Sequence, residues 1–267
     1  MLETPMGWML LLVLGTFTGT LSGLLGIGGG LLMVPALTLF GVPLVQATAT
    51  SLVGVFLSSV SGSLRNLRMR ELNWRVSLVL AAFGIFTAQG GAWLGDRIPD
   101  HWISLSFAAL LLLTIYLMNL RQSLKRRQMA ISADPLAVSK PAPVTRIRFA
   151  PTAGIGLLVG LLSGLFGVGG GLVMVPLQML LLNEHIKSAV RTSLGAIVAI
   201  AISALAQHAW NGNVLWIPGL CLGLGGIVGA QIGTRLLPRF AEQTVNLMFQ
   251  GTLITLAFYM VIRVFSH

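Results

Sequence analysis

The chain has 267 residues, of which 55% are hydrophobic and only 9% are charged. Because about a quarter of the residues in a soluble globular protein are charged, a chain of this composition could not cover its own core with polar surface. The composition therefore excludes an ordinary soluble domain and predicts an integral membrane protein.

The net charge of +10 at pH 7 comes mainly from Lys and Arg in two loops, so it indicates topology rather than a nucleic-acid partner. All seven acidic residues lie in or beside polar breaks between hydrophobic runs. We therefore expect no carboxylate at mid-membrane, where pumps often place one. The single cysteine, Cys221, provides neither a disulfide framework nor a metal-ligand spacing, and we expect no metal and no cofactor.

The first half of the chain begins with an apolar segment at residues 8–40 that is too long for one span and is interrupted by glycines. This pattern predicts a helix, a loop at residues 26–30 and a second helix shorter than a full span. Three apolar runs follow at residues 43–64, 75–95 and 101–120. Each has about the 20 residues that a helix needs to cross a bilayer.

The second half has the same order of elements. A broken segment at residues 151–182 precedes runs at residues 191–207, 214–234 and 243–263. We expect a first transmembrane repeat at residues 1–120, a basic cytoplasmic linker at 121–149 and a second repeat at 150–267. Pro and Ser among the basic residues of the linker predict a flexible tether.

An internal duplication supports this division. Residues 22–35 (SGLLGIGGGLLMVP) recur at residues 163–176 as SGLFGVGGGLVMVP, with constant spacing over fourteen positions. A Thr-Ser-Leu triplet follows each copy, and a Gly-xxx-Gly pattern, which is typical of helix-packing faces, follows later in each half. The sequence therefore predicts two homologous repeats within an all-α membrane fold.

The relative orientation of the repeats depends on whether each broken segment crosses the membrane or returns to its starting side. Cytoplasmic loops carry an excess of Lys and Arg. If both broken segments are re-entrant and return to their starting side, fifteen of the 17 Lys and Arg residues lie in the cytoplasm. If both segments cross the membrane, only twelve lie there. The count favours inverted repeats, with both chain termini on the exterior side.

The glycine runs interrupt helices inside hydrocarbon, where free backbone groups are tolerated only if they line a cavity or are buried in protein. The helix that starts after each run directs free N–H groups and the positive end of its dipole at the loop, which suits an anion. The alternative is that the glycines only allow tight helix packing. The presence of two copies at equivalent positions favours a binding site.

We expect substrate contact from the glycine runs and from the hydroxyl groups and the cation near them. Arg191 can hold an anion bidentately or can extend to the cytoplasmic interface. The candidate substrate-binding residues are Ser22, Gly26, Gly28, Gly29, Gly30, Thr50, Ser51, Ser163, Gly167, Gly169, Gly170, Gly171, Arg191, Thr192 and Ser193. Asn66 and His208 hold equivalent positions in the two halves and are candidates for a gate or for proton coupling, with an interfacial histidine as the alternative for His208.

These motifs make the chain resemble the sulfite exporter TauE/SafE family, also called the sulfonate uptake permease family. The resemblance covers essentially the whole chain and rests on paired Ser-Gly-x-x-Gly-x-Gly-Gly-Gly-x-x-x-Val-Pro motifs, each followed by a Thr-Ser pair and a Gly-xxx-Gly span. It implies export or uptake of small sulfur oxyanions or organosulfonates, such as sulfite or sulfoacetate, across the bacterial inner membrane. The motifs are specific for the family and not for one substrate.

The leading function is a secondary transporter that works by alternating access around the two glycine-rich loops. No nucleotide-binding motif follows the glycines, so the energy must come from a gradient or a partner. Proton coupling would use His208, Glu184, His185 or the substrate itself. The alternatives are a passive anion channel and an intramembrane hydrolase with Ser163 as nucleophile and His208 as base.

We rank the hydrolase last because Ser22 has only Asn66 at the position equivalent to the histidine, so we expect no enzyme. The expected partners are a small anionic substrate and the lipid bilayer, with no nucleic acid. The sequence leaves open whether the chain forms a homo-oligomer.

Overall fold

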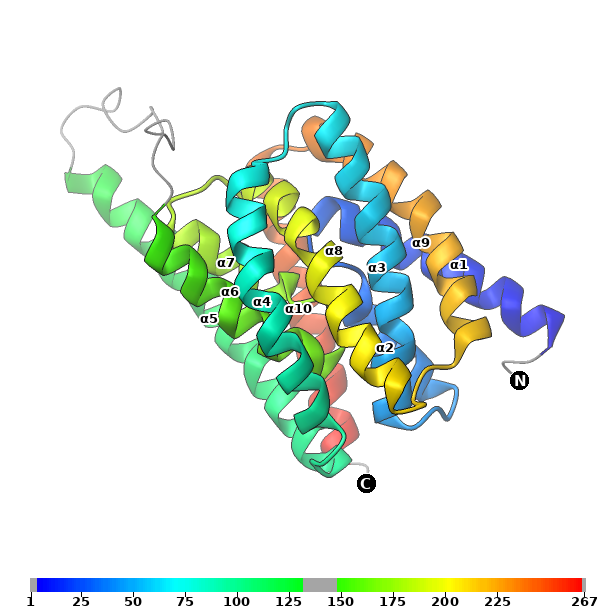
Figure 1. Cartoon of the computed structure of the whole chain (residues 1–267). Coiled ribbons are helices and arrows are strands. Elements are labelled where there is room, and N and C mark those ends of the chain that lie inside the picture. The colour runs from blue at the N-terminus through cyan, green and yellow to red at the C-terminus, as the bar shows by residue number, and fades with distance from the viewer. Residues whose placement is uncertain (1–3, 132–147, 266–267) are drawn as a thin grey trace.

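The computed structural model describes residues 4–131 and 148–265, and within these ranges every regular element is a helix (Figure 1). The long helices are α1 Pro5–Leu25, α3 Leu44–Arg68, α4 Trp74–Gly95, α5 Asp100–Ile131, α6 Phe149–Phe166, α8 Ile186–Trp210, α9 Trp216–Leu236 and α10 Glu242–Phe265. The short ones are α2 Gly30–Leu39, α7 Gly171–Leu181 and the 3-10 turn η1 Leu237–Arg239. The all-α fold class is confirmed.

Seven of the described helices are long and apolar enough to cross a membrane, namely α1, α3, α4, α5 over residues 101–119, α6, α8 and α9. The predicted full-length runs correspond to α3, α4, α5, α8, α9 and α10. The first part of each broken segment, α1 or α6, is itself long enough to span. The multi-pass membrane character predicted from composition is therefore confirmed.

Both predicted helix breaks are present. α1 and α6 end at Gly26 and Gly167, which adopt left-handed conformations with φ of 71° and 67° and donate their N–H groups to Ser22 O and Ser163 O. Glycine is the residue that reaches this conformation without a Cβ clash, so it ends a helix readily. α2 and α7, with 10 and 11 residues, are too short to cross a bilayer of ordinary thickness.

The first part of the predicted linker is helical rather than flexible. α5 continues through Ile131, well beyond the predicted boundary at residue 120. Residues 120–131 contain neither Gly nor Pro and are rich in strong helix formers, so nothing local stops the helix before Pro135. Residues 132–147 of the linker lie outside the described residues.

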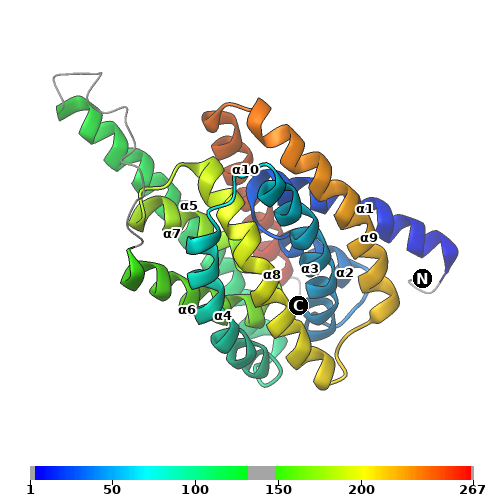
Figure 2. The ribbon, with the colours of Figure 1, turned by 45° about the horizontal axis from the view of Figure 1, so that its top comes forward.

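Glycines bring two helix pairs into close contact. α1 packs along α9 and α6 packs along α4, and each pair runs in parallel (Figures 1 and 2). A Cβ atom added to Gly19 would come within 2.6 Å of the carbonyl oxygen of Gly226. Gly91 and Gly229, from the predicted Gly-xxx-Gly faces, would likewise meet the backbones of α6 and α1. Their predicted role in helix packing is confirmed.

The first long helices after the two glycine runs are α3 and α8. They lie side by side and run antiparallel (Figure 1). Val55 and Ile197 both lie beside Gly28, whereas Gly62, farther along α3, lies against Leu194, which is earlier in α8. α1 and α9 run in the direction of α3, and α4 and α6 run in the direction of α8. The long helices around the centre therefore form two groups of opposite direction.

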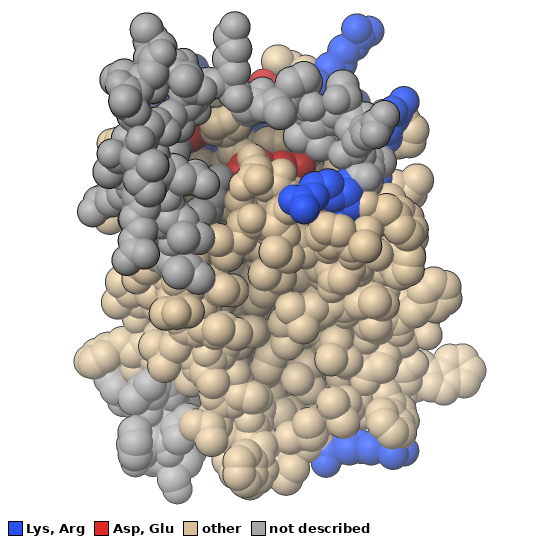
Figure 3. Space-filling view, turned by 90° about the vertical axis from the view of Figure 1, so that its left-hand side faces the viewer, with Lys and Arg blue, Asp and Glu red and all other residues tan. Residues whose placement is uncertain are grey.

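Charged side chains gather at the two ends of the molecule. Figure 3 shows a broad band without Lys, Arg, Asp or Glu between charged residues at the top and at the bottom of one face. Arg65 donates to Thr234 O at 2.7 Å, and Arg191 pairs with Glu71 at 3.1 Å, so the ends of α3 and α9 and the start of α8 share one end. We call this the basic end, and it carries Arg65, Arg68, Arg70, Arg75, Lys187, Arg191, Arg235 and Arg239.

Candidate functional site

The two glycine loops, residues 26–29 and 167–170, meet at the centre of the molecule. A Cβ atom on Gly30 would collide with the carbonyl oxygen of Gly167, and one on Gly171 would collide with that of Gly26. All the glycines of both loops are buried. The loops therefore contact each other through backbone, and the site is closed in this conformation.

Two serines after the loops hold them in place by reciprocal hydrogen bonds. Ser51 of α3 donates to Gly167 O at 2.9 Å, and Ser193 of α8 donates to Gly26 O at 2.9 Å. Both hydroxyl groups are fully buried and also bond within their own helices. Each half of the chain thus fixes the loop of the other half.

The half-helices α2 and α7 both begin at this contact. Their N-cap residues, Gly29 and Gly170, have φ of 85° and 77° and provide no side-chain hydrogen bond to the first turn. Helix N-termini carry free N–H groups and a partial positive charge. Two such termini therefore lie near the point where the loops meet.

A buried hydroxyl accompanies each of these termini. The Cβ atom of Ser22 lies 3.6 Å from the position that a Cβ atom would take on Gly29. The Cβ atom of Ser163 lies 3.4 Å from the corresponding position on Gly170. The side chains of Ser22 and Ser163 are 1% and 0% exposed, and their hydroxyl groups have no hydrogen-bond partner. Buried polar groups in proteins are rarely left unpaired, which makes both hydroxyls candidates for contact with a ligand.

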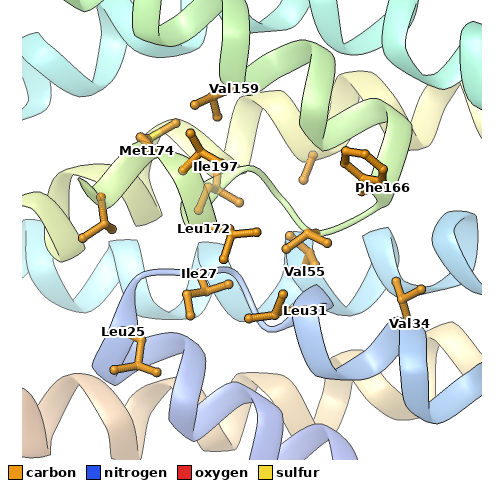
Figure 4. Close-up of a cluster of buried hydrophobic side chains, with 14 of the residues drawn as sticks. Leu25, Ile27, Leu31, Val34, Val55, Val159, Phe166, Leu172, Met174 and Ile197 are labelled. Atoms are coloured by element: carbon orange, nitrogen blue, oxygen red, sulfur yellow. The ribbon is translucent and has the colours of Figure 1, made fainter. Parts of the chain in front are cut away.

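Apolar side chains enclose this arrangement. Figure 4 shows Ile27, Leu31, Val55, Leu172 and Ile197 around the two loops. All five are buried in one hydrophobic cluster. In such surroundings the backbone N–H groups and serine hydroxyls act at low dielectric, where they interact with charge more strongly than in water.

The threonines beside the two serines differ in their contacts. The Thr50 hydroxyl accepts a hydrogen bond from Leu215 N at 3.1 Å, whereas the fully buried Thr192 hydroxyl has no partner. Arg191 lies at the basic end with Glu71. The structure therefore places Arg191 outside the contact between the loops.

The two gate candidates lie at opposite ends of the molecule because α3 and α8 are antiparallel. Asn66 is buried near the basic end, and its amide nitrogen has no partner. His208 lies near the opposite end and is 1% exposed. Its Nε2 lies 3.2 Å from Gly164 O and its Nδ1 lies 3.5 Å from Asp96.

The sequence did not single out Asp96 as a functional residue. Its carboxylate accepts hydrogen bonds from Asn211 and Asn213 and lies beside His208, so it joins the end of α4 to the α8–α9 turn. The only sequence signal was its place directly after the second glycine of a Gly-xxx-Gly face. We call this cluster the Asp96 end, since it lies opposite the basic end.

The residues of the hydrolase alternative do not form a catalytic pair. A serine nucleophile needs a base within hydrogen-bond reach. The Ser163 hydroxyl has no hydrogen-bond partner, and the His208 ring faces Gly164 O and Asp96 instead. No observation in the described residues favours this alternative.

Glu184 and His185, the other candidates for proton coupling, lie in the turn between α7 and α8. Burial raises the pKa of Glu184, and a hydrogen bond from Ser188 at 3.3 Å acts in the opposite direction. His185 lies 3.2 Å from Glu242, and both of these side chains are about half exposed.

Comparison with known proteins identifies the same family that the sequence motifs resemble. The model of the family "Sulfite exporter TauE/SafE" matches residues 11–260. The probable membrane transporter protein YunE of Bacillus subtilis is 28% identical over 93% of this chain and 95% of its own length. A probable membrane transporter protein of Methanocaldococcus jannaschii is 24% identical over 95% of each chain, and one of Xylella fastidiosa is 28% identical over 93% of each. No solved structure shows significant similarity.

Proposed function

Because the chain belongs to the sulfite exporter TauE/SafE family of membrane transporters, we propose that it carries small sulfur oxyanions or organosulfonates, such as sulfite or sulfoacetate, as a secondary transporter. We place it in the bacterial inner membrane, with a small anion as its ligand. The family match supports membrane transport and suggests the sulfur-containing substrate class, and the chemistry of the two loops supports an anion as the ligand.

The observation that carries the proposal is the pairing of each half-helix N-terminus with a buried, unpartnered serine hydroxyl. Free N–H groups at helix N-termini bind oxyanions, and hydroxyl groups add neutral donors. Such a donor set suits an oxyanion better than a cation or an apolar solute.

The proposed mechanism is alternating access around the contact between the loops. The antiparallel directions of α3 and α8 agree with inverted repeats, in which α2 and α7 are re-entrant half-helices. The reciprocal bonds from Ser51 and Ser193 hold the closed arrangement. Opening toward either side requires the two halves to move relative to each other around this contact.

The experiment that tests the proposal is uptake and counterflow in proteoliposomes, with sulfite, sulfoacetate, sulfate and chloride, with and without a pH gradient. Saturable exchange of the sulfur anions is the expected result. Fast flux without counterflow would indicate the channel, and no flux of any of the four anions would refute the proposed substrate class.

The topology gives a first prediction. With both termini outside and the basic end in the cytoplasm, a membrane-impermeant maleimide added to intact cells should label Arg97→Cys and not Arg239→Cys, each in a Cys221→Ser background. Permeabilised cells provide the control, since both cysteines should then react. Labelling of Arg239→Cys in intact cells would contradict the inverted arrangement.

Arg191 gives a second prediction. If it binds the anion on its way to the loops, Arg191→Gln should raise KM at least about tenfold, because a charge-assisted hydrogen bond contributes about 1.5–3 kcal/mol. Glu71→Gln is the matched control, because it breaks the same ion pair but leaves the cation free. We expect its KM to be unchanged or lower. Equal effects of both variants would mean that the pair is only structural.

A further inference from the structure

A large cleft lies away from the glycine loops, between α3, α4 and α8. Its volume is about 420 Å³, which is within the range of ligand sites in proteins. The three helices lie side by side in Figure 1. The walls are almost entirely apolar and include Leu67, Leu78 and Val198. This cleft plays no part in the proposed transport site.

The cleft opens on the outer surface of the helix bundle. Leu67, Trp74 and Leu78 line it and are 52%, 57% and 62% exposed. Its wall on α3 extends from Val60 to Leu67, and at 1.5 Å per residue this length is about 10 Å. That is roughly a third of the hydrocarbon thickness of a bilayer. The cleft therefore lies in the leaflet next to the basic end.

A cation lies beside the cleft at the basic end. The Arg75 guanidinium lies 5.5 Å from the centre of the Trp74 ring, and Trp74 lines the cleft. Arg68 directly follows the lining residue Leu67, and both arginines are exposed. Glu71, the carboxylate in the same turn, is paired with Arg191. An apolar groove with a basic mouth is complementary to a lipid with an anionic headgroup.

We propose that this cleft binds an anionic phospholipid, with one acyl chain between α3, α4 and α8 and the phosphate at Arg75 and Arg68. Basic pockets between transmembrane helices on the cytoplasmic side bind such headgroups, and each nearby Lys or Arg contributes about 1 kcal/mol. The proposal requires a membrane-embedded chain and is independent of which anion is transported.

The test is native mass spectrometry of the full chain, purified in detergent and given equal amounts of phosphatidylglycerol and phosphatidylcholine with identical acyl chains. We expect phosphatidylglycerol to be retained at least about fivefold better. Arg75→Gln should reduce this retention about fivefold, which is the contribution of one cation. Equal retention of both lipids by the wild type would overturn the proposal.

Arg97→Gln is the matched control, because Arg97 also lies over a tryptophan, Trp93, but at the opposite end. We expect it to retain phosphatidylglycerol like the wild type. An equal loss with Arg97→Gln and Arg75→Gln would indicate nonspecific attraction to the net charge and would also overturn the proposal.

A second pair of variants tests the acyl chain. Ala199→Phe fills the cleft from α8, and Ser63→Phe fills it from α3 in case the first variant folds poorly. Either should abolish the preferential retention. Ala82→Phe adds the same bulk at an exposed position of α4 outside the lining and should have no effect. Undiminished retention in both filled variants would show that the lipid binds elsewhere.

Discussion

Gly29→Val and Gly170→Val are each expected to reduce the transport rate to below about one-tenth of wild type while the protein still inserts. Both glycines have φ near +80°, where a β-branched residue is strained by more than about 1–2 kcal/mol. At Gly170 the new side chain would also collide with Val159. In either variant the added side chain would lie beside the N-terminus of a half-helix and the adjacent serine.

Gly41→Val is the control for this prediction. Gly41 has a φ of 82°, but a Cβ atom there would meet nothing within 4 Å. Gly41→Val therefore has the same backbone strain but lies outside the glycine loops, so its transport rate should stay near wild type. Initial rates of counterflow, normalised to reconstituted protein, provide the measurement. Full transport by Gly29→Val and Gly170→Val would show that the glycine loops are not part of the binding site.

Ser51→Ala combined with Ser193→Ala is expected to lower both stability and transport. Each substitution leaves a buried loop carbonyl without its serine donor, at a cost of about 1–3 kcal/mol. The double variant should therefore unfold several degrees below wild type in detergent. Its transport should fall several-fold, because the two loops lose the bonds that align them.

Ser203→Ala separates the two effects. Ser203 of α8 donates to Ile85 O of α4 at 2.8 Å, an equally short bond between helices that lies away from the loops. Ser203→Ala should lose about as much stability as either single variant and keep its transport. Equal losses of transport in Ser203→Ala and in Ser51→Ala would mean that the loop bonds have no special role.

The sequence predicted the breaks in the broken segments because glycine has a local effect. Each of the runs at residues 26–30 and 167–171 contains three glycines with positive φ, and the structure confirms both breaks. The Gly-xxx-Gly faces were also predictable, because small residues at a spacing of four form one helix surface. The end of α5 was misjudged because polar composition was taken as a sign of flexibility, although no helix breaker precedes Pro135.

The contacts of the candidate site depend on long-range packing, which one sequence does not reveal. Ser51 and Gly167 are 116 residues apart, and no local pattern indicates that a serine in one half binds the loop of the other. The hydroxyls of Ser51 and Ser193 were expected to face a substrate but bond loop carbonyls in this closed form. Asp96 was missed because its partners lie in a turn more than a hundred residues away.

The central claim is that an anion binds where the two half-helices begin. The most direct measurement is the reaction of Ser22→Cys and Ser163→Cys, each in a Cys221→Ser background, with a small thiol reagent in proteoliposomes. Sulfoacetate should slow the modification of both cysteines over the same range of concentrations in which its transport saturates. Chloride should not slow the modification. Cysteines that react equally fast with and without sulfoacetate would contradict a site at the glycine loops.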